Sequence, residues 1–421
     1  MAQFSRRTAL GLIPAGVGLA ACGGRTLTDL PPSNDPAQIV RTLTEGPAGK
    51  RAAATGFVLM RNGEILSSAA FGAASGLSQA EQTAGVKLRE FKTTTSFRAA
   101  SISKVATAVI AAILHLEGHL NLDAPVREYL GSELVPDGSM PPITLRMLLS
   151  HTSGLSDPEV YWLHHPHSID EMISTAIAKR HDRGFEYCNF GYSIAATLME
   201  RATKERFDRL VRSRFLQMPM DVGFNWSGVT AKTRRRGATL YRETKAGWEV
   251  QVDGPSTLTA NKPAILLEDG ANLLTYTAGQ NGTLFSPQGG LRIDLVDLAR
   301  LAQLLADAPD LTTPVWTLNA AKTNGVHDGR YFTQFGTGVH IHPANESIWP
   351  GHTLWGHHGE AYGLYAGAWY APQLDISFSY CVTGTPETPP KRSRQHPALN
   401  TFTEKLMDAV IAAYAASPAA I

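Results

Sequence analysis

Residues 95–114 read TSFRAASISKVATAVIAAIL, a polar start followed by a long apolar run. Apolar side chains recur at helical spacing, at Val105, Val109 and Ile113, which predicts a helix over residues 100–119. Ser101 and Lys104 are three residues apart, so they share one face of that helix. A hydroxyl where the helix starts also lies at the positive end of its dipole. The pair is a candidate nucleophile and base, although Ser-x-x-Lys also arises by chance about once in a chain of this size.

The flanking sequence predicts strands at both ends of the chain and helices between them. Asn62-Gly63 separates two short apolar runs, which is typical of a hairpin. Strand patterns return after residue 333, and the apolar face of residues 402–415 predicts a helix that covers a sheet. Helical patterns lie in the middle, at residues 169–179, 192–202 and 294–306. We expect an α+β fold, in which an antiparallel sheet pairs the N- and C-terminal parts, is flanked by helices and carries an inserted, mainly helical subdomain. The expected domain spans residues 51–421, with the helical subdomain at roughly 105–330.

The composition is that of an ordinary soluble globular protein. Of 421 residues, 43% are hydrophobic and 18% are charged, and the formal net charge is +1. Because so small a net charge creates no strong field, we expect no nucleic acid partner.

The N-terminus, MAQFSRRTALGLIPAGVGLAAC, has the features of an export signal. Arg6 and Arg7 precede an apolar stretch, residues 9–21, that is too short to span a bilayer. The paired arginines resemble a bacterial twin-arginine signal, and the end of the stretch resembles a lipobox. We expect residues 1–21 to be a signal peptide, Cys22 to be lipidated and residues 22–50 to be a tether. The chain would then be exported, periplasmic and anchored to the membrane by lipid. A buried N-terminal helix is the alternative interpretation.

A second candidate stretch, FEYCNFGY, spans residues 185–192. Tyr187 and Asn189 are two residues apart, so in an extended loop both point into the same cleft. A phenol beside a lysine can relay a proton, and an amide can bind a substrate carbonyl or the lysine itself. Taken alone, the stretch fits a core tyrosine beside a turn asparagine better.

A third stretch, LWGHHGEAYG, spans residues 354–363. His357 would face the cleft, and Gly359 would let a substrate backbone approach closely. The N–H of Glu360 could join the N–H of Ser101 in holding an oxyanion. Taken alone, this stretch also fits surface histidines in a glycine-rich turn.

The order of these three motifs closely resembles the serine β-lactamase and penicillin-binding-protein superfamily. The nearest branch is that of class C β-lactamases, D-aminopeptidases and family VIII esterases. Residues 148–155, LLSHTSGL, look like that branch's signature, and the Gly289-Gly290-Leu291 segment looks like another of its features. The resemblance covers about residues 50–421.

The resemblance implies a role for each matching residue. Ser101 matches the acylated nucleophile, Lys104 the lysine that activates it and Tyr187 the tyrosine that moves protons. Asn189 matches the asparagine of the second motif. His357 stands where the lactamases usually have the lysine of Lys-Thr-Gly. A histidine is mostly neutral at pH 7, so efficient β-lactam turnover is not expected.

Two other interpretations carry less weight. Ser193 lies one residue short of a Gly-x-Ser-x-Gly elbow and sits inside a helical pattern without a preceding strand. The histidines of residues 162–167, WLHHPH, lack the spacing of metal ligands. His151 and Ser153 are interpreted as structural residues that shape a turn at the cleft wall.

We therefore expect an exported serine hydrolase that forms an acyl-enzyme on Ser101. Its substrate would be a small-molecule ester, amide or peptide, most simply an ester or a D-amino-acid amide. The mechanism requires no metal and no organic cofactor. A D-alanyl carboxypeptidase or weak β-lactamase is the alternative among enzymes. It would need a cation to hold the substrate carboxylate, either a protonated His357 or an arginine that the sequence does not identify. A catalytically silent sensor of penicillin or peptidoglycan is the alternative from another class.

Overall fold

The computed structural model describes residues 35–417, except for 136–137, 139, 164, 255–272, 327–328, 330, 387–390 and 394. The predicted signal peptide, Cys22 and the start of the tether lie outside the described residues. None of the helices over the described part of the chain is both long and apolar enough to cross a membrane.

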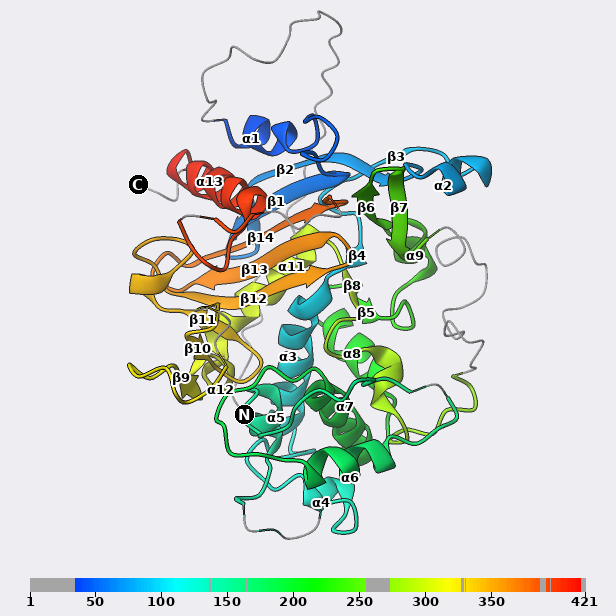
Figure 1. Ribbon diagram of the computed structural model, residues 1–421, viewed down its shortest axis with the longest axis vertical. Coiled ribbons are helices and arrows are strands. Elements are labelled where there is room, and N and C mark those ends of the chain that lie inside the picture. The colour runs from blue at the N-terminus through cyan, green and yellow to red at the C-terminus, as the bar shows by residue number, and fades with distance from the viewer. Residues whose placement is uncertain are drawn as a thin grey trace, which may run out of the picture.

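An antiparallel sheet of nine strands forms one half of the molecule, drawn in the upper part of Figure 1. Its order is β3-β2-β1-β14-β13-β12-β11-β10-β9, so the first strands of the chain pair with the last. The strands are β1 Ala54–Arg61, β2 Glu64–Ser75, β3 Arg89–Glu90, β9 Trp316–Thr317, β10 Gln334–Phe335, β11 His340–His342, β12 Leu354–Ala361, β13 Leu364–Ala371 and β14 Ile376–Thr383. The predicted pairing of N- and C-terminal parts is present.

The predicted hairpin joins β1 to β2. Asn62 and Gly63 both have positive φ, 49° and 81°, which a two-residue hairpin turn requires. Asparagine and glycine adopt this region at little cost, so the dipeptide fixes the position of the turn.

Side chains alternate between the two faces of the sheet. On β1, Phe57 and Leu59 pack with α13 (Thr401–Ala415), whereas Val58 and Met60 belong to the core on the opposite face, together with residues of α11 (Leu295–Gln303). Both sets are fully buried. The sheet is therefore covered by α13 on one face and by α11 on the other (Figure 1).

A short helix, α1 (Pro36–Thr42), corrects the predicted tether. It packs against α13 and β2, with Val40 fully buried and Leu43 nearly so. Asp35 caps the helix by accepting a hydrogen bond from the N–H of Ala37. The predicted tether of residues 22–50 is therefore wrong from residue 36 onward. The prolines of this segment suggested an extended linker, but the apolar side chains between them pack into the core.

The helical part lies beside the sheet (Figure 1) and is inserted along the chain between its first three strands and its last six. Its longer helices are α3 Ser103–Leu116, α6 Asp170–Ala178, α7 Phe190–Thr203 and α8 Phe207–Leu216. The shorter helices of the described residues, some of them beside the sheet, are α2 Gln79–Thr83, η1 Ala100–Ile102, α4 Arg127–Leu130, α5 Leu145–Leu149, α9 Ala231–Arg235, η2 Gly282–Phe285, η3 Leu304–Asp307, α12 Pro309–Thr312 and η5 Ala344–Glu346. Two small sheets accompany them, β4 Phe97–Arg98, β5 Gly223–Phe224 and β8 Leu291–Ile293 in one, and β6 Leu240–Thr244 and β7 Gly247–Val252 in the other.

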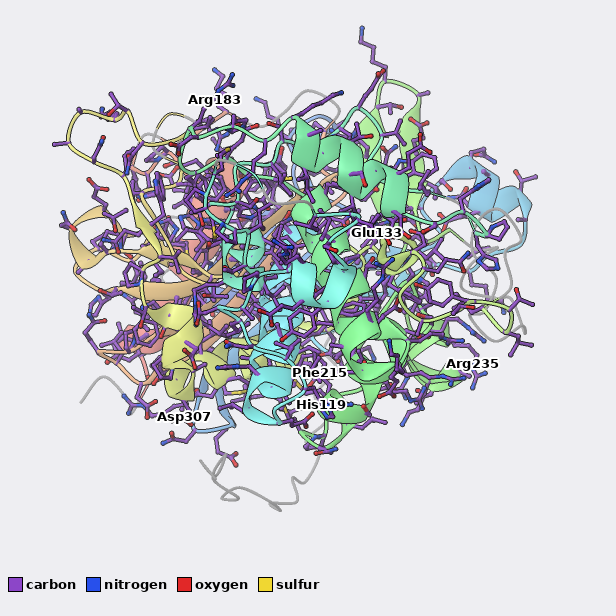
Figure 2. The ribbon with its side chains drawn as sticks, turned by 90° about the horizontal axis from the view of Figure 1, so that it is seen from below. His119, Glu133, Arg183, Phe215, Arg235 and Asp307 are labelled. Atoms are coloured by element: carbon purple, nitrogen blue, oxygen red, sulfur yellow. The ribbon has the colours of Figure 1, made fainter. Side chains whose placement is uncertain are left out.

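The predicted helix over residues 100–119 is a 3₁₀ turn, η1, followed by α3. Most of α3 is buried, as expected of an apolar helix without a polar face. It ends at Leu116, since Gly118 takes φ 77°. Arg214 of α8 forms a 2.8 Å ion pair with Glu117, directly after α3, in the region where Figure 2 labels His119 and Phe215.

Candidate active site

Ser101 lies in the middle of η1, at the N-terminal start of α3. Its side chain is half-buried. The preceding residue, Ala100, has φ 48°, an uncommon conformation for a residue with a Cβ. Strained backbone of this kind often marks a functional site. The turn thus presents the Ser101 hydroxyl at the sheet side of the helix, where β12 packs against η1.

Lys104 is fully buried one turn later and reaches three acceptors. Its Nζ lies 3.2 Å from Ser101 Oγ, 2.8 Å from Asn189 Oδ1 and 3.1 Å from the carbonyl oxygen of Gln288. Burial lowers the pKa of Lys104 to about 7, and the negative charge of Asp157 partly opposes that shift. A substantial fraction of the amine is therefore neutral near pH 7 and able to accept a proton.

Tyr187 lies against the same pair. Its ring centroid is 4.6 Å from Lys104 Nζ. Burial raises the pKa of Tyr187 well above its usual value, and a hydrogen bond with Ser101 opposes the shift in part. The phenol is consequently protonated at neutral pH and is a proton donor rather than a tyrosinate base.

Asn189 joins Lys104 to an acid that the sequence did not reveal. Its Oδ1 accepts from Lys104, and its Nδ2 donates to Asp157 Oδ2 at 2.8 Å. Asp157 Oδ1 accepts from the N–H of Phe190 at 2.7 Å, at the start of α7. The two bonds orient the amide, so that its oxygen faces the lysine. Asp157 follows the signature stretch by two residues, but nothing in the local pattern pointed from it to Asn189.

His357 and Gly359 lie on the face of β12 that contacts η1. A Cβ at Gly359 would stand 2.5 Å from the carbonyl oxygen of Ala99, so only glycine allows this approach. Glu360 follows, close to the end of β12, with an exposed side chain. The close contact brings the backbone of residues 359–360 to the turn that holds Ser101.

His357 does not supply a cation. Burial and the neighbouring Lys104 lower its pKa to about 3, so the ring is neutral at physiological pH. Its Nδ1 lies 2.5 Å from the carbonyl oxygen of His358, while its Nε2 has no hydrogen-bond partner among the described residues. The protonated His357 considered from the sequence is therefore absent near neutral pH.

His151 braces the Tyr187 loop, in agreement with the structural role predicted for it. Its Nδ1 accepts from the N–H of Cys188 at 3.0 Å, and its ring packs 4.3 Å from that of Tyr187. Ser193, the alternative nucleophile, is buried inside α7, and its hydroxyl has no hydrogen-bond partner in the described part of the chain. Cys188 and Cys381 are both buried and free.

The structure thus brings Ser101, Lys104, Tyr187, Asn189 and His357 to one place. Ser101 comes from η1 and Lys104 from α3, while the others come from the loop before α7 and from β12. Asp157 and the carbonyl of Gln288 are additions that sequence reasoning missed. A main-chain acceptor leaves no signal in residue identity, and the Asp157 contact spans 32 residues of chain.

A family model described as "Beta-lactamase" matches residues 39–401. The chain belongs to the beta-lactamase family. This match confirms the family expected from the motifs. Esterase EstB from Burkholderia gladioli is 42% identical over 109 residues, which is 25% of this chain and 24% of the esterase. Two fimbrial assembly proteins FimD from Dichelobacter nodosus, of serogroups D and H1, are 26% and 28% identical over 34% and 32% of their own length. The chain therefore spans about a third or less of the length of these three curated relatives.

Solved structures confirm the fold. D-amino acid amidase from Ochrobactrum anthropi SV3 superimposes with a TM-score of 0.61 at 18% identity, covering 90% of this chain and 97% of the amidase. A beta-lactamase/D-alanine carboxypeptidase from Yersinia pestis gives a TM-score of 0.59 at 16% identity, over 90% and 97% of the two chains. At such identities the likeness establishes the architecture alone.

Proposed function

We propose that this chain is an exported serine hydrolase that cleaves small esters or D-amino-acid amides through an acyl-enzyme on Ser101. The observation that carries the proposal is the buried Lys104, whose Nζ lies 3.2 Å from Ser101 Oγ and whose pKa is lowered to about 7. A serine hydroxyl is a weak nucleophile by itself and needs such a base.

The order of proton transfers follows from two groups: Lys104 is partly neutral near pH 7, and Tyr187 is protonated. Neutral Lys104 accepts the Ser101 proton while Oγ attacks the substrate carbonyl. The N–H groups of Ser101 and Glu360 hold the oxyanion that develops. Tyr187 donates its proton to the leaving alcohol or amine and regains one from Lys104. Water then attacks the acyl-enzyme by the reverse transfers and releases the acid.

The neutral His357 supports esters and amides over substrates that end in a carboxylate. A carboxypeptidase needs a cation beside the reacting bond, and the imidazole with a pKa of about 3 carries no charge at pH 7. The esterase relative agrees with a preference for esters. A D-alanyl carboxypeptidase is accordingly the weaker alternative.

Export and lipid anchoring belong to the same proposal and rest on the N-terminal sequence alone. Arg6, Arg7 and Cys22 carry them. Growth of an expressing bacterium with labelled fatty acid tests the anchor, which Cys22→Ala should abolish. Label that remains on the variant would contradict lipidation at this residue.

The activity is tested with the chain beginning at residue 23. Its turnover of p-nitrophenyl acetate, D-phenylalanine amide and a chromogenic β-lactam is compared with that of Ser101→Ala and of Ser193→Ala. We expect ester or amide turnover that is lost in Ser101→Ala and kept in Ser193→Ala. Normal turnover by Ser101→Ala would contradict the nucleophile. Stable acylation without turnover would favour a covalent sensor instead.

A further inference from the structure

Three buried histidines gather on the face of the sheet opposite the catalytic residues. His340 and His342 are two residues apart on β11. Successive side chains of a strand point to opposite faces, so these two share a face. The pairing of His340 with Gly356 puts His358, two residues further along β12, on that same face. His357 and Gly359 point the other way, toward η1. The three-histidine cluster, His340, His342 and His358, thus borders the active site from the other face of the sheet, with the ring centroid of His340 6.3 Å from that of His357.

The nitrogens of the three-histidine cluster converge. One ring nitrogen from each residue lies within 4.8 Å of the other two. His342 Nε2 and His358 Nε2 are 3.2 Å apart. Two nitrogens bound to one tetrahedral zinc ion at about 2.0–2.1 Å stand roughly 3.3 Å from each other. The separation of the His342 and His358 nitrogens thus already fits a shared metal.

His340 lacks the hydrogen bonds that a buried imidazole needs. It is fully buried, and neither of its ring nitrogens has a hydrogen-bond partner in the described part of the chain. A buried polar group without a partner costs about 1–3 kcal/mol. A metal ion would supply the missing partner for one of the two nitrogens.

The surroundings keep the rings in the form that binds metals. Burial, together with the neighbouring histidines, lowers the pKa of each ring well below its usual value, so all three are neutral with a free lone pair. Trp369 packs 4.6–5.7 Å from each of the three rings and restricts their movement.

A fourth histidine, His396, packs against the cluster, but both of its ring nitrogens form hydrogen bonds with the main chain. Its ring lies 5.2 Å from that of His342. Its Nδ1 accepts from the N–H of Ala398, and its Nε2 donates to the carbonyl oxygen of Glu346. A cavity of about 110 Å³, lined by His358, Tyr331 and Glu360 among others, adjoins the cluster. His358 is the member of the cluster that lines it, and the cavity has room for a water beside that residue.

We propose that His340, His342 and His358 bind one divalent transition-metal ion, with Zn²⁺ as the expected ion. Three imidazoles without a thiolate suit zinc, copper or nickel rather than magnesium or calcium. The ion joins β11 to β12 on the far side of the strand that carries His357 and Gly359. Its role is to hold that strand, and it takes no part in the acyl transfer.

The test removes metals from the chain from residue 23 with a chelator, adds Zn²⁺ back and removes the excess. We expect one equivalent of bound Zn²⁺ by elemental analysis, a rise in melting temperature on adding Zn²⁺, and the visible absorption of tetrahedral Co²⁺ when cobalt is added instead. Absence of stoichiometric binding and of the cobalt bands in the unmodified chain would overturn the proposal, whatever the variants do.

The variant His340→Phe tests whether the three histidines bind a metal ion or only pack against one another. The phenyl ring suits a place that contacts Phe332 and Phe335, and no hydrogen bond of the His340 ring is lost. We expect the variant to fold and to lose Zn²⁺ affinity by more than about 100-fold, beyond the effect of removing a supporting contact. The exposed His119→Phe should bind zinc as the unmodified chain does. Zinc binding that survives in His340→Phe would also overturn the proposal.

Discussion

At the scale of single residues, catalysis depends on the protonation of Lys104. Only the neutral amine can accept the Ser101 proton, and the pKa of Lys104 is about 7. We therefore expect kcat/KM for an ester to rise with pH through about 7. A pH profile measured with p-nitrophenyl acetate checks this, and a profile that falls with rising pH between 6 and 8 would contradict a lysine base.

Asp157 sets part of that value. Its negative charge favours protonated Lys104 and so raises the lysine pKa against the larger effect of burial. Asp157→Asn removes the charge, so the pKa of Lys104 should fall and the acid limb of the profile should move to lower pH. The exposed neighbour Glu159→Gln is the matched control and should leave the limb in place. An acid limb that moves to higher pH in Asp157→Asn would contradict the claim that the charge of Asp157 raises the pKa of Lys104.

Tyr187 is expected to act as the proton donor to the leaving group. Tyr187→Phe keeps the ring packing on Phe332 and His151 while it removes the proton. General acid–base groups contribute about 10²–10⁴ in rate, so kcat should fall by that factor with KM little changed. Tyr129→Phe, far from the site, is the control. A loss below about threefold in steady-state ester turnover would remove Tyr187 from the mechanism.

At the scale of elements, the site depends on the contact between β12 and η1. Gly359→Ala would place a Cβ 2.5 Å from the carbonyl oxygen of Ala99, so the strand or the turn must move. Because a misplacement of about 1 Å can cost 10² in rate, kcat should fall by roughly that factor.

The control for this contact is Gly138→Ala, since nothing lies within 4 Å of a Cβ at Gly138. Circular dichroism and melting temperature would show whether both variants remain folded. Full activity in a folded Gly359→Ala would mean that the close approach is unnecessary.

The sequence predicted elements better than it predicted contacts. Asn62-Gly63 and the apolar face of residues 402–415 act locally, so the hairpin and the last helix could be inferred from nearby residues. Asp157, Gln288 and the three-histidine cluster depend on which distant segments meet. In the cluster, His342 and His358 are 16 residues apart and belong together only through the register of β11 with β12. Nothing in either short stretch specifies that register.

At the scale of the whole molecule, the two ends of the chain close one domain. β1 pairs with β14, and α1 packs against α13. Val40 is fully buried between them. Val40→Ala removes two buried carbons and should lower the free energy of unfolding by about 1–3 kcal/mol.

Denaturant unfolding measures this loss, with the exposed Glu45→Ala as the control, which should change stability by less than about 0.5 kcal/mol. Ester turnover should be unaffected in Val40→Ala, because α13 and α1 cover the face of the sheet away from Ser101. An unchanged stability would mean that residues 36–42 are a tether after all.

The central claim is that Ser101 carries the acyl group. The most direct measurement is mass spectrometry of the chain from residue 23, quenched with acid during turnover of p-nitrophenyl acetate and then digested. We expect one acetyl group on the peptide that contains Ser101, and none on any peptide of Ser101→Ala. An acetyl group on another residue, or turnover that continues in Ser101→Ala, would contradict the account.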